Sequence, residues 1–181
     1  MPEDALLDRV QALVPQLGWT RRALAQAAGD EALALNAFPG GPRDAVAAMS
    51  RRADRLMVED AGELDGLRTP ARIRRLIECR LTRAEPHREA VRQAMAVLAL
   101  PWNAPLGMRL VAETADAMWM AAGDTSSDIS RYTRRATLVA VYSATLAFWL
   151  RQPAGNMPQV MAFLDRRLAG VARLQKSRPA A

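Results

Sequence analysis

The side chains able to carry out chemistry are few in this 181-residue chain. His87 is the single histidine and Cys79 is the single cysteine. A protein zinc site needs three or four ligands, which one histidine and one cysteine do not supply. Cys79 lies in an arginine-rich segment with no neighbouring base to activate it, and a lone cysteine forms no internal disulfide. We therefore expect a protein that is not an enzyme and that holds no metal and no cofactor.

The acidic residues suggest no acid–base pair either. Arg109, Glu113 and Asp116 are spaced four and three residues apart, which places them on one face of a helix. The arginine beside the two carboxylates predicts an ion-paired surface. No segment alternates with the period of a strand, so no glycine-rich phosphate loop can follow one.

The elements that position these residues are predicted to be helices throughout. Apolar residues recur at helical spacing, and we expect an all-α fold of about nine helices. Thr20 and Asp30 are expected to cap the second and third helices, and Gly29 to close the second. The predicted helices begin near residues 3, 20, 30, 42, 69, 85, 104, 125 and 156.

The first 40 residues resemble the helix-turn-helix head of TetR-family regulators. Three short helices precede a Gly-Gly-Pro turn and a longer fourth helix. Phe38 occupies the place of the aromatic residue that closes the recognition helix in that family. The resemblance implies a DNA-binding head followed by a helical ligand-binding body.

The charge pattern argues against DNA binding. The candidate recognition helix, residues 30–38, begins with Asp30 and Glu31 and carries one amide, Asn36. Residues 1–60 have a net charge of −2, whereas the rest of the chain has +8. Because phosphate contacts supply most of the affinity for DNA, we expect no nucleic-acid partner. A ligand-responsive transcriptional regulator remains the alternative.

The later helices are unusually apolar. Residues 136–150 contain no charge, and the preceding helix carries Met108, Met118 and Trp119. Methionine adapts to irregular cavities, so these helices form either a solid core or a pocket for a flexible ligand. Their hydroxyl groups either bond to helix carbonyls or meet the polar head of a ligand; they belong to Thr137, Tyr142, Ser143 and Thr145.

The predicted fifth helix is rich in arginine. We expect its arginines to form a solvated face, with attraction to an anionic membrane surface as the alternative. They are Arg68, Arg72, Arg74, Arg75, Arg80 and Arg83.

Residues 123–136 resemble the central motif of the lipid-binding ubiquinone-biosynthesis accessory proteins, the Coq-nine family. Eight positions match that motif: Gly123, Asp124, Ser126, Asp128, Tyr132, Thr133, Arg135 and Ala136. Shorter matching pieces occur in the family's order at residues 18–19, 38–40, 98–101, 116–119 and 163–167. The resemblance implies a TetR-like homodimer that does not bind DNA. It also implies a hydrophobic pocket for polyprenyl quinone intermediates, which are presented to the demethoxyubiquinone hydroxylase.

This resemblance predicts how the chain is divided into domains and where its binding surfaces lie. We expect a degenerate helix-turn-helix subdomain at 1–60, a helical lipid-binding and dimerisation body at 61–176 and a tail at 177–181, with the dimer using the eighth and ninth helices. The expected lipid-binding residues are Ile77, Leu81, Met95, Leu98, Met108, Val111, Met118, Leu138, Val141 and Tyr142. The expected partner surface comprises Asp124, Ser126, Asp128, Arg131, Tyr132, Arg134 and Arg135.

Two departures from the family pattern affect its partners. Ile129-Ser130-Arg131 replaces the family's Phe-Asn-Trp, so Arg131 removes an aromatic anchor from the expected hydroxylase surface. The sequence shows no amphipathic helix after the ninth and no targeting leader. We therefore expect a cytoplasmic protein, with peripheral contact at the inner face of the membrane made by other means.

Overall fold

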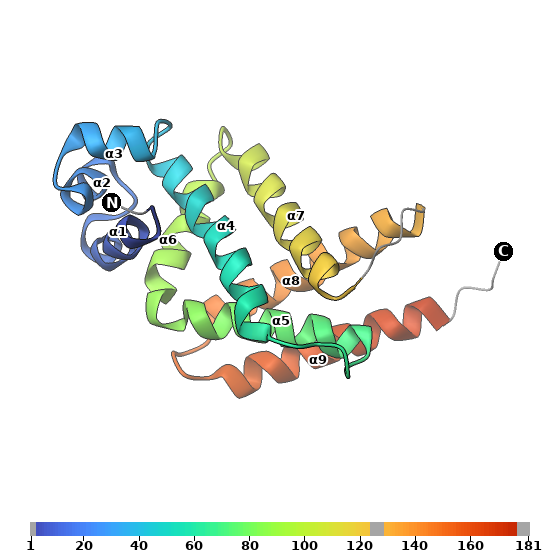
Figure 1. Cartoon of the computed structure of the whole chain (residues 1–181). Coiled ribbons are helices and arrows are strands. Elements are labelled where there is room, and N and C mark those ends of the chain that lie inside the picture. The colour runs from blue at the N-terminus through green and yellow to red at the C-terminus, as the bar shows by residue number, and fades with distance from the viewer. Residues whose placement is uncertain (1–2, 124–128, 177–181) are drawn as a thin grey trace. The chain divides into compact units, whose positions relative to one another are not determined.

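All the regular secondary structure in the described parts of the chain is helical, as predicted. The computed structural model describes residues 3–123 and 129–176, and no strand occurs among them (Figure 1). The helices are α1 (Glu3–Leu17), α2 (Arg21–Ala28), α3 (Glu31–Ala37), α4 (Pro42–Ala61), α5 (Thr69–Ala84), α6 (Arg88–Leu98), α7 (Ala104–Ala121), α8 (Ile129–Arg151) and α9 (Met157–Lys176). A 3-10 turn, η1 (Glu85–His87), precedes α6.

Local signals set the ends of the short N-terminal helices. The Thr20 hydroxyl accepts a hydrogen bond from the Ala23 amide at 3.2 Å, which satisfies one of the free donors at the start of α2. Gly29 closes the same helix at a φ of 84°, a conformation that favours glycine. Asp30 occupies the N-cap position of α3, as predicted, but its side chain makes no capping hydrogen bond.

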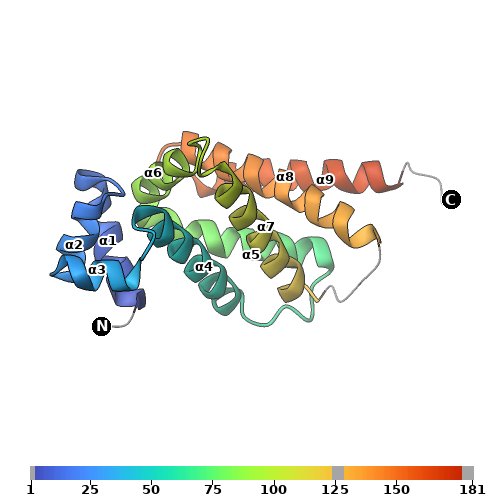
Figure 2. The same ribbon diagram turned by 90° about the horizontal axis from the view of Figure 1, so that it is seen from above.

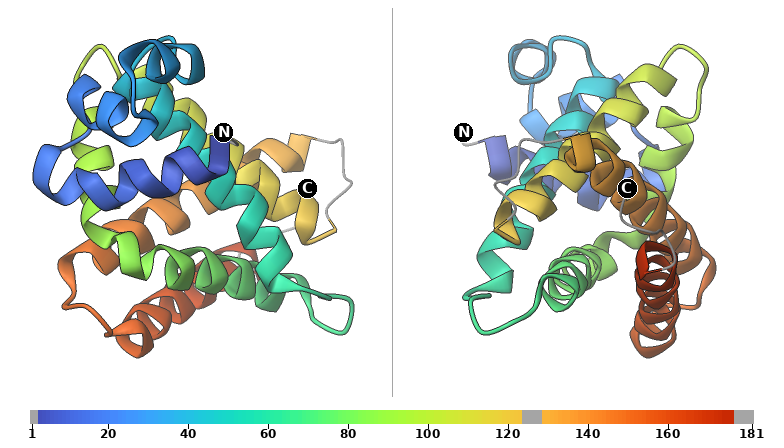
Figure 3. Two further views of the ribbon diagram at one scale, coloured as in Figure 1. Left: turned by 60° about the vertical axis from the view of Figure 1, so that its left-hand side comes forward. Right: turned by 90° about the vertical axis from the view of Figure 1, so that its right-hand side faces the viewer.

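The chain divides into two compact units, Met1–Arg55 with Pro86–Leu110 and Leu56–Glu85 with Val111–Ala181. In the first unit, α1, α2 and α3 pack together, and α6 packs against α1 (Figure 3). Its core includes Leu7, Val10 and Phe38, which are almost fully buried. The linear order of the sequence does not indicate that α6 joins the N-terminal helices.

The second unit is built on α5, α8 and α9. The helices α8 and α9 lie side by side, and α5 contacts both (Figure 2). The Glu85 carboxylate accepts hydrogen bonds from Trp149 Nε1 at 2.7 Å and from the Gly155 amide at 2.9 Å. These bonds hold the turn between α8 and α9 against the end of α5. Among the described residues, no helix combines the length and apolar character that crossing a membrane requires.

Candidate functional site

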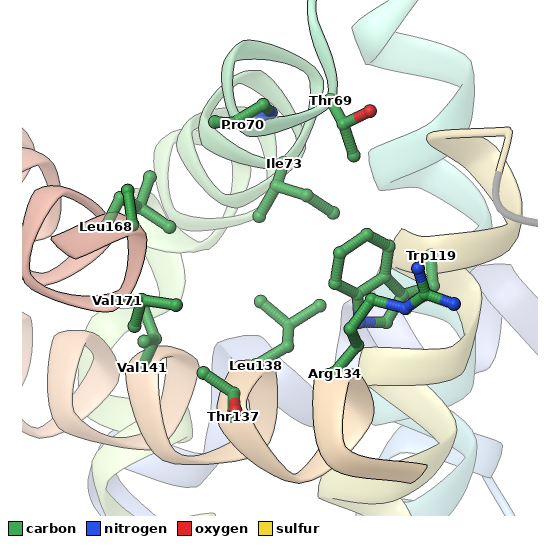
Figure 4. Close-up of a pocket in the computed structure, with 11 residues that line it drawn as sticks. Thr69, Pro70, Ile73, Trp119, Arg134, Thr137, Leu138, Val141, Leu168 and Val171 are labelled. Atoms are coloured by element: carbon green, nitrogen blue, oxygen red, sulfur yellow. The ribbon is translucent and has the colours of Figure 1, made fainter. Parts of the chain in front are cut away.

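A small pocket lies in the second unit, between α5, α7, α8 and α9 (Figure 4). Its volume is about 100 Å³. The residues around it are Thr69, Pro70, Ile73, Trp119, Arg134, Thr137, Leu138, Val141, Leu168, Val171 and Ala172. Most of them are apolar, so the pocket is suited to an apolar group.

Helical spacing explains how α8 supplies one wall. Arg134, Thr137, Leu138 and Val141 are separated by three, four and seven residues, so they share one face of the helix. Leu138 and Val141 are 3% and 7% exposed. The same spacing brings Leu168, Val171 and Ala172 of α9 to the neighbouring wall, where Val171 lies beside Val141 (Figure 4). The uncharged stretch of α8 therefore contributes both to the core and to the pocket.

The nitrogen-bearing side chains of the pocket, Trp119 and Arg134, lie next to each other (Figure 4). The Nε1 atom of Trp119 is buried and has no hydrogen-bond acceptor among the residues that the structure describes. The Thr137 hydroxyl donates to the Thr133 carbonyl at 2.8 Å. Because its proton is used in this bond, the oxygen can only accept a hydrogen bond from another group. No acidic residue lines the pocket.

A second polar cluster lies within the core of the same unit. Arg80 is 8% exposed, and its Nε donates to the Tyr142 hydroxyl at 2.7 Å. Its guanidinium also reaches the Thr114 hydroxyl at 3.4 Å and lies 5.6 Å from the centre of the Tyr142 ring. The expectation that Arg80 belongs to a solvated face is wrong, because its position on α5 faces α7 and α8.

The other arginines of α5 make mostly surface contacts. Arg74 pairs with Asp165 of α9 at 2.7 Å, and Arg83 pairs with Asp60. Hydrogen bonding from Arg83 holds the pKa of the Asp60 carboxyl below its usual value. Arg72 donates to the Ala122 carbonyl at 3.0 Å, which ties the end of α7 to α5.

The expected lipid-binding residues occupy several environments. Leu138 and Val141 line the pocket. Four others are buried in the second unit away from it: Ile77, Leu81, Met118 and Tyr142. Val111 is half-buried. Met95, Leu98 and Met108 belong to the first unit, where Met95 is 40% and Met108 67% exposed.

Sequence reasoning missed most of the pocket. A wall from α5 was expected, but through Ile77 and Leu81, whereas Thr69, Pro70 and Ile73 form it. The wall from α9 and the polar pair Trp119 and Arg134 were not expected there. The signal for α9 was available, because Leu168, Val171 and Ala172 already have helical spacing in the sequence. The role of Arg134 was hidden, since an arginine in a charged half-helix is indistinguishable from a surface residue.

The expected partner surface is described only in part. Asp124, Ser126 and Asp128 lie outside the described residues, as does the side chain of Arg131. Tyr132 is 76% exposed. Arg134 lines the pocket, and the Arg135 guanidinium donates to the Asp116 carboxylate. Tyr132 is therefore the member of this set that is plainly available at the surface.

The reactive residues of the sequence are not gathered into a centre. In the ranges that the structure describes, no group of three or more histidine, cysteine, aspartate or glutamate side chains could hold a metal ion. Cys79 is buried, and burial raises the pKa of its thiol. A raised pKa keeps the sulfur protonated and a poor nucleophile.

Comparison with known proteins points to the same family as the sequence motif. Residues 104–175 match the COQ9 family. The human mitochondrial ubiquinone biosynthesis protein COQ9 is 29% identical over 175 residues, covering 90% of this chain and 55% of that protein. The Schizosaccharomyces pombe protein coq9 is 29% identical over 167 residues, covering 90% of this chain and 67% of that protein. The chain thus spans about half the length of the animal relatives it matches.

A solved structure supports the fold independently. The TetR transcriptional regulator from Nitrosomonas europaea superposes with a TM-score of 0.74 at 24% identity, covering 94% of this chain and 97% of that one. At this identity the likeness establishes the fold alone. Both the TetR-like fold and the resemblance to the ubiquinone-biosynthesis accessory family are confirmed.

Proposed function

We propose, from the COQ9 segment and the TetR-like fold, that this protein is a non-catalytic accessory protein of ubiquinone biosynthesis. It binds polyprenyl quinone intermediates and presents them to a modifying enzyme such as the demethoxyubiquinone hydroxylase. One observation carries the proposal: the segment that matches the family supplies every pocket-lining residue except the three from α5.

The size of the pocket limits how such a lipid binds. Apolar cavities of about 150 Å³ take up a single benzene ring. A pocket of about 100 Å³ is smaller than that, so it suits a single prenyl unit, and the rest of a long tail lies outside it. Each buried apolar square ångström contributes about 25 cal/mol, offset by the cost of ordering the chain. The affinity should consequently depend little on tail length beyond the first units.

The partner and the dimer are further parts of the proposal. The exposed ring of Tyr132 belongs to the matched motif and is an aromatic group of the kind found at interface hot spots. We assign the enzyme-facing surface to this start of α8. The dimer forms through α8 and α9, by analogy with TetR-like proteins, and the protein acts at the inner face of the membrane.

Mass spectrometry of lipid extracted from the purified protein tests the proposal. The protein should be produced in cells that make ubiquinone and compared with a Val171→Phe variant, whose larger side chain fills the pocket. We expect prenylated quinone precursors with the wild type and several-fold less with the variant. An extract free of isoprenoids, even after precursors are added to the protein, would contradict lipid binding.

A ligand-responsive regulator is the second candidate, because the fold is TetR-like. The helix in the recognition position, α3, exposes Leu33 and Leu35 at 56% and 53%. Leucine offers no donor or acceptor to a base edge, which favours the accessory role. Gel-shift measurements with genomic fragments at low salt separate the two candidates. A discrete, sequence-dependent shift would support the regulator.

A further inference from the structure

We propose that the corner between α6 and α7, residues 95–108, inserts into a lipid surface with Trp102 at the level of the headgroups. This α6–α7 corner belongs to the first unit, within Pro86–Leu110, and Figure 1 shows it as a turn between the two helices. The inference rests on the proposed function, because it names the surface through which the protein reaches the membrane that holds its lipid. That surface is separate from the pocket, whose residues all belong to the second unit.

Exposed apolar side chains are concentrated at the α6–α7 corner. Ten large hydrophobic residues are exposed among those that the structure describes, and four of them lie here: Met95, Leu100, Trp102 and Met108. The two most exposed are Trp102 at 72% and Met108 at 67%. Single exposed apolar residues are ordinary on a protein surface, whereas a group of them in one place marks a binding surface.

The charge pattern around the corner is complementary to an anionic membrane. Residues 93–108 contain no acidic or basic side chain. The nearest charged residues on either side in the sequence are Arg92 and Arg109, and basic residues near a membrane surface are attracted to anionic lipids. Arg92 pairs with Glu89, so we expect the apolar contact to contribute more than the charge.

The polar groups of the corner are largely bonded within it. The Asn103 amide donates to the Leu100 carbonyl at 2.8 Å, and the buried Asn103 side chain donates to the Val97 carbonyl at 3.0 Å. Pro101 and Pro105 carry no amide proton that would need an acceptor. Because unbonded backbone donors are costly in lipid, this arrangement lowers the cost of moving the corner out of water.

The types of the exposed residues favour a lipid surface over a protein partner. Tryptophan combines an apolar ring with one N–H donor and is enriched where the hydrocarbon of a membrane meets its headgroups. Methionine is flexible and adapts to irregular surroundings. Protein interfaces combine such residues with direct hydrogen bonds. Asn103 carries the only amide side chain of residues 94–108, and that amide already bonds within the corner.

Flotation of the whole chain with lipid vesicles tests this assignment. The vesicles consist of phosphatidylethanolamine with a minority of phosphatidylglycerol, or of phosphatidylcholine alone. The wild type should float with both and bind the anionic vesicles more tightly. Trp102→Ser should weaken binding to both about ten-fold, because the indole no longer contributes apolar surface. The matched control is Leu33→Ser, which removes a 56% exposed side chain from α3 of the same unit and should bind as the wild type does.

A fluorescent label locates the contact independently. Met108→Cys is labelled with a dye whose emission shifts to the blue in an apolar environment. Cys79 competes little for the dye, because it is buried and burial raises the pKa of its thiol. Vesicles should shift the emission of the dye at this position. The same dye on Leu33→Cys should not respond, and circular dichroism of each variant identifies a folding defect.

Three results would overturn the inference. The first is a wild type that floats with neither kind of vesicle. The second is a Trp102→Ser variant that floats as the wild type does, or a dye on Met108→Cys that does not respond. The third is an oligomer that Trp102→Ser dissociates in analytical ultracentrifugation while flotation is unchanged, which would assign the corner to a protein interface.

Uptake of a polyprenyl quinone from detergent micelles separates this inference from the proposed function, because it needs no vesicle. The wild type and Trp102→Ser should take up the quinone equally. Loss of vesicle binding in Trp102→Ser with uptake retained would support the inference. Uptake by a wild type that binds no vesicles would overturn the inference and leave lipid binding intact, whereas vesicle binding without uptake would contradict the proposed function.

Discussion

Trp19 in the first unit and Trp119 in the second show how differently the two units treat a buried indole. Trp19 is 6% exposed, and its N–H bonds to the Ala90 carbonyl of α6. The Trp119 ring borders a pocket, and its equally buried N–H has no acceptor among the described residues. A satisfied indole contributes to packing and stability, whereas an unsatisfied one beside empty space is available to a ligand.

The largest expected effect is the loss of stability when Trp19 is replaced. Trp19→Ala should lower the free energy of unfolding by about 3–5 kcal/mol, because it leaves a cavity and an unpaired carbonyl. Trp119→Ala should cost clearly less, since part of its ring already borders a pocket. Urea unfolding followed by circular dichroism measures both values. Equal losses of unfolding free energy in the two variants would show that both indoles contribute equally to stability.

Within the second unit, the buried Tyr142, which contacts Arg80, can be compared with the exposed Tyr132. Tyr142→Phe removes the acceptor of the Arg80 Nε bond and should lower the free energy of unfolding by about 1.5–3 kcal/mol. Tyr132→Phe is the matched control, because Tyr132 is 76% exposed and should change stability by less than about 0.5 kcal/mol. If urea unfolding gives the same small change for both variants, the buried arginine does not depend on Tyr142.

A more conservative change isolates the indole proton itself. Trp119→Phe should alter the free energy of unfolding by less than about 1 kcal/mol without ligand, because the lost donor bonds to none of the described residues. Trp19→Phe removes a bonded donor and should cost about 1–3 kcal/mol. Thermal unfolding in the absence of lipid measures the pair. A larger loss at Trp119 would reverse the interpretation of the two sites.

The smallest expected effect concerns the surface pair of Asp60 and Arg83. The pKa of Asp60 lies below its ordinary value of 3.8, chiefly through its hydrogen bond from Arg83. The pair therefore stabilises the fold above about pH 4, and this contribution is lost as the pH falls through the lowered pKa. For a largely exposed pair it amounts to at most about 1 kcal/mol. Asp60→Asn should remove that difference between pH 7 and pH 3, and an unchanged pH profile would contradict it.

The positions of the helices could be predicted from the sequence, whereas most residues of the pocket could not. Helical spacing, the Thr20 cap and the Gly29 stop are local, and the structure confirms them. The grouping of α6 with the N-terminal helices depends on contacts between distant segments, which periodicity does not encode. The burial of Arg80 and the place of Arg134 in the pocket could not be predicted either. The sequence of a helix does not show whether an arginine faces solvent or another helix.

The pocket residues illustrate the same limit. Leu138 and Val141 could be expected at the site because they lie in the uncharged stretch of residues 136–150. Ile77, Leu81 and Met118 are equally apolar, and the structure buries them away from the pocket. Hydrophobicity predicts burial, and only the three-dimensional packing decides which buried residues leave a space between them.

Native mass spectrometry of the protein with a polyprenyl quinone intermediate tests the central claim most directly. The wild type should carry one lipid per chain, and Val171→Phe should lose most of that signal because it fills the pocket. Ala169→Phe, at an exposed position of the same helix, should bind as the wild type does. No bound lipid on the wild type, or the same occupancy in all three proteins, would contradict a ligand site between α5, α7, α8 and α9.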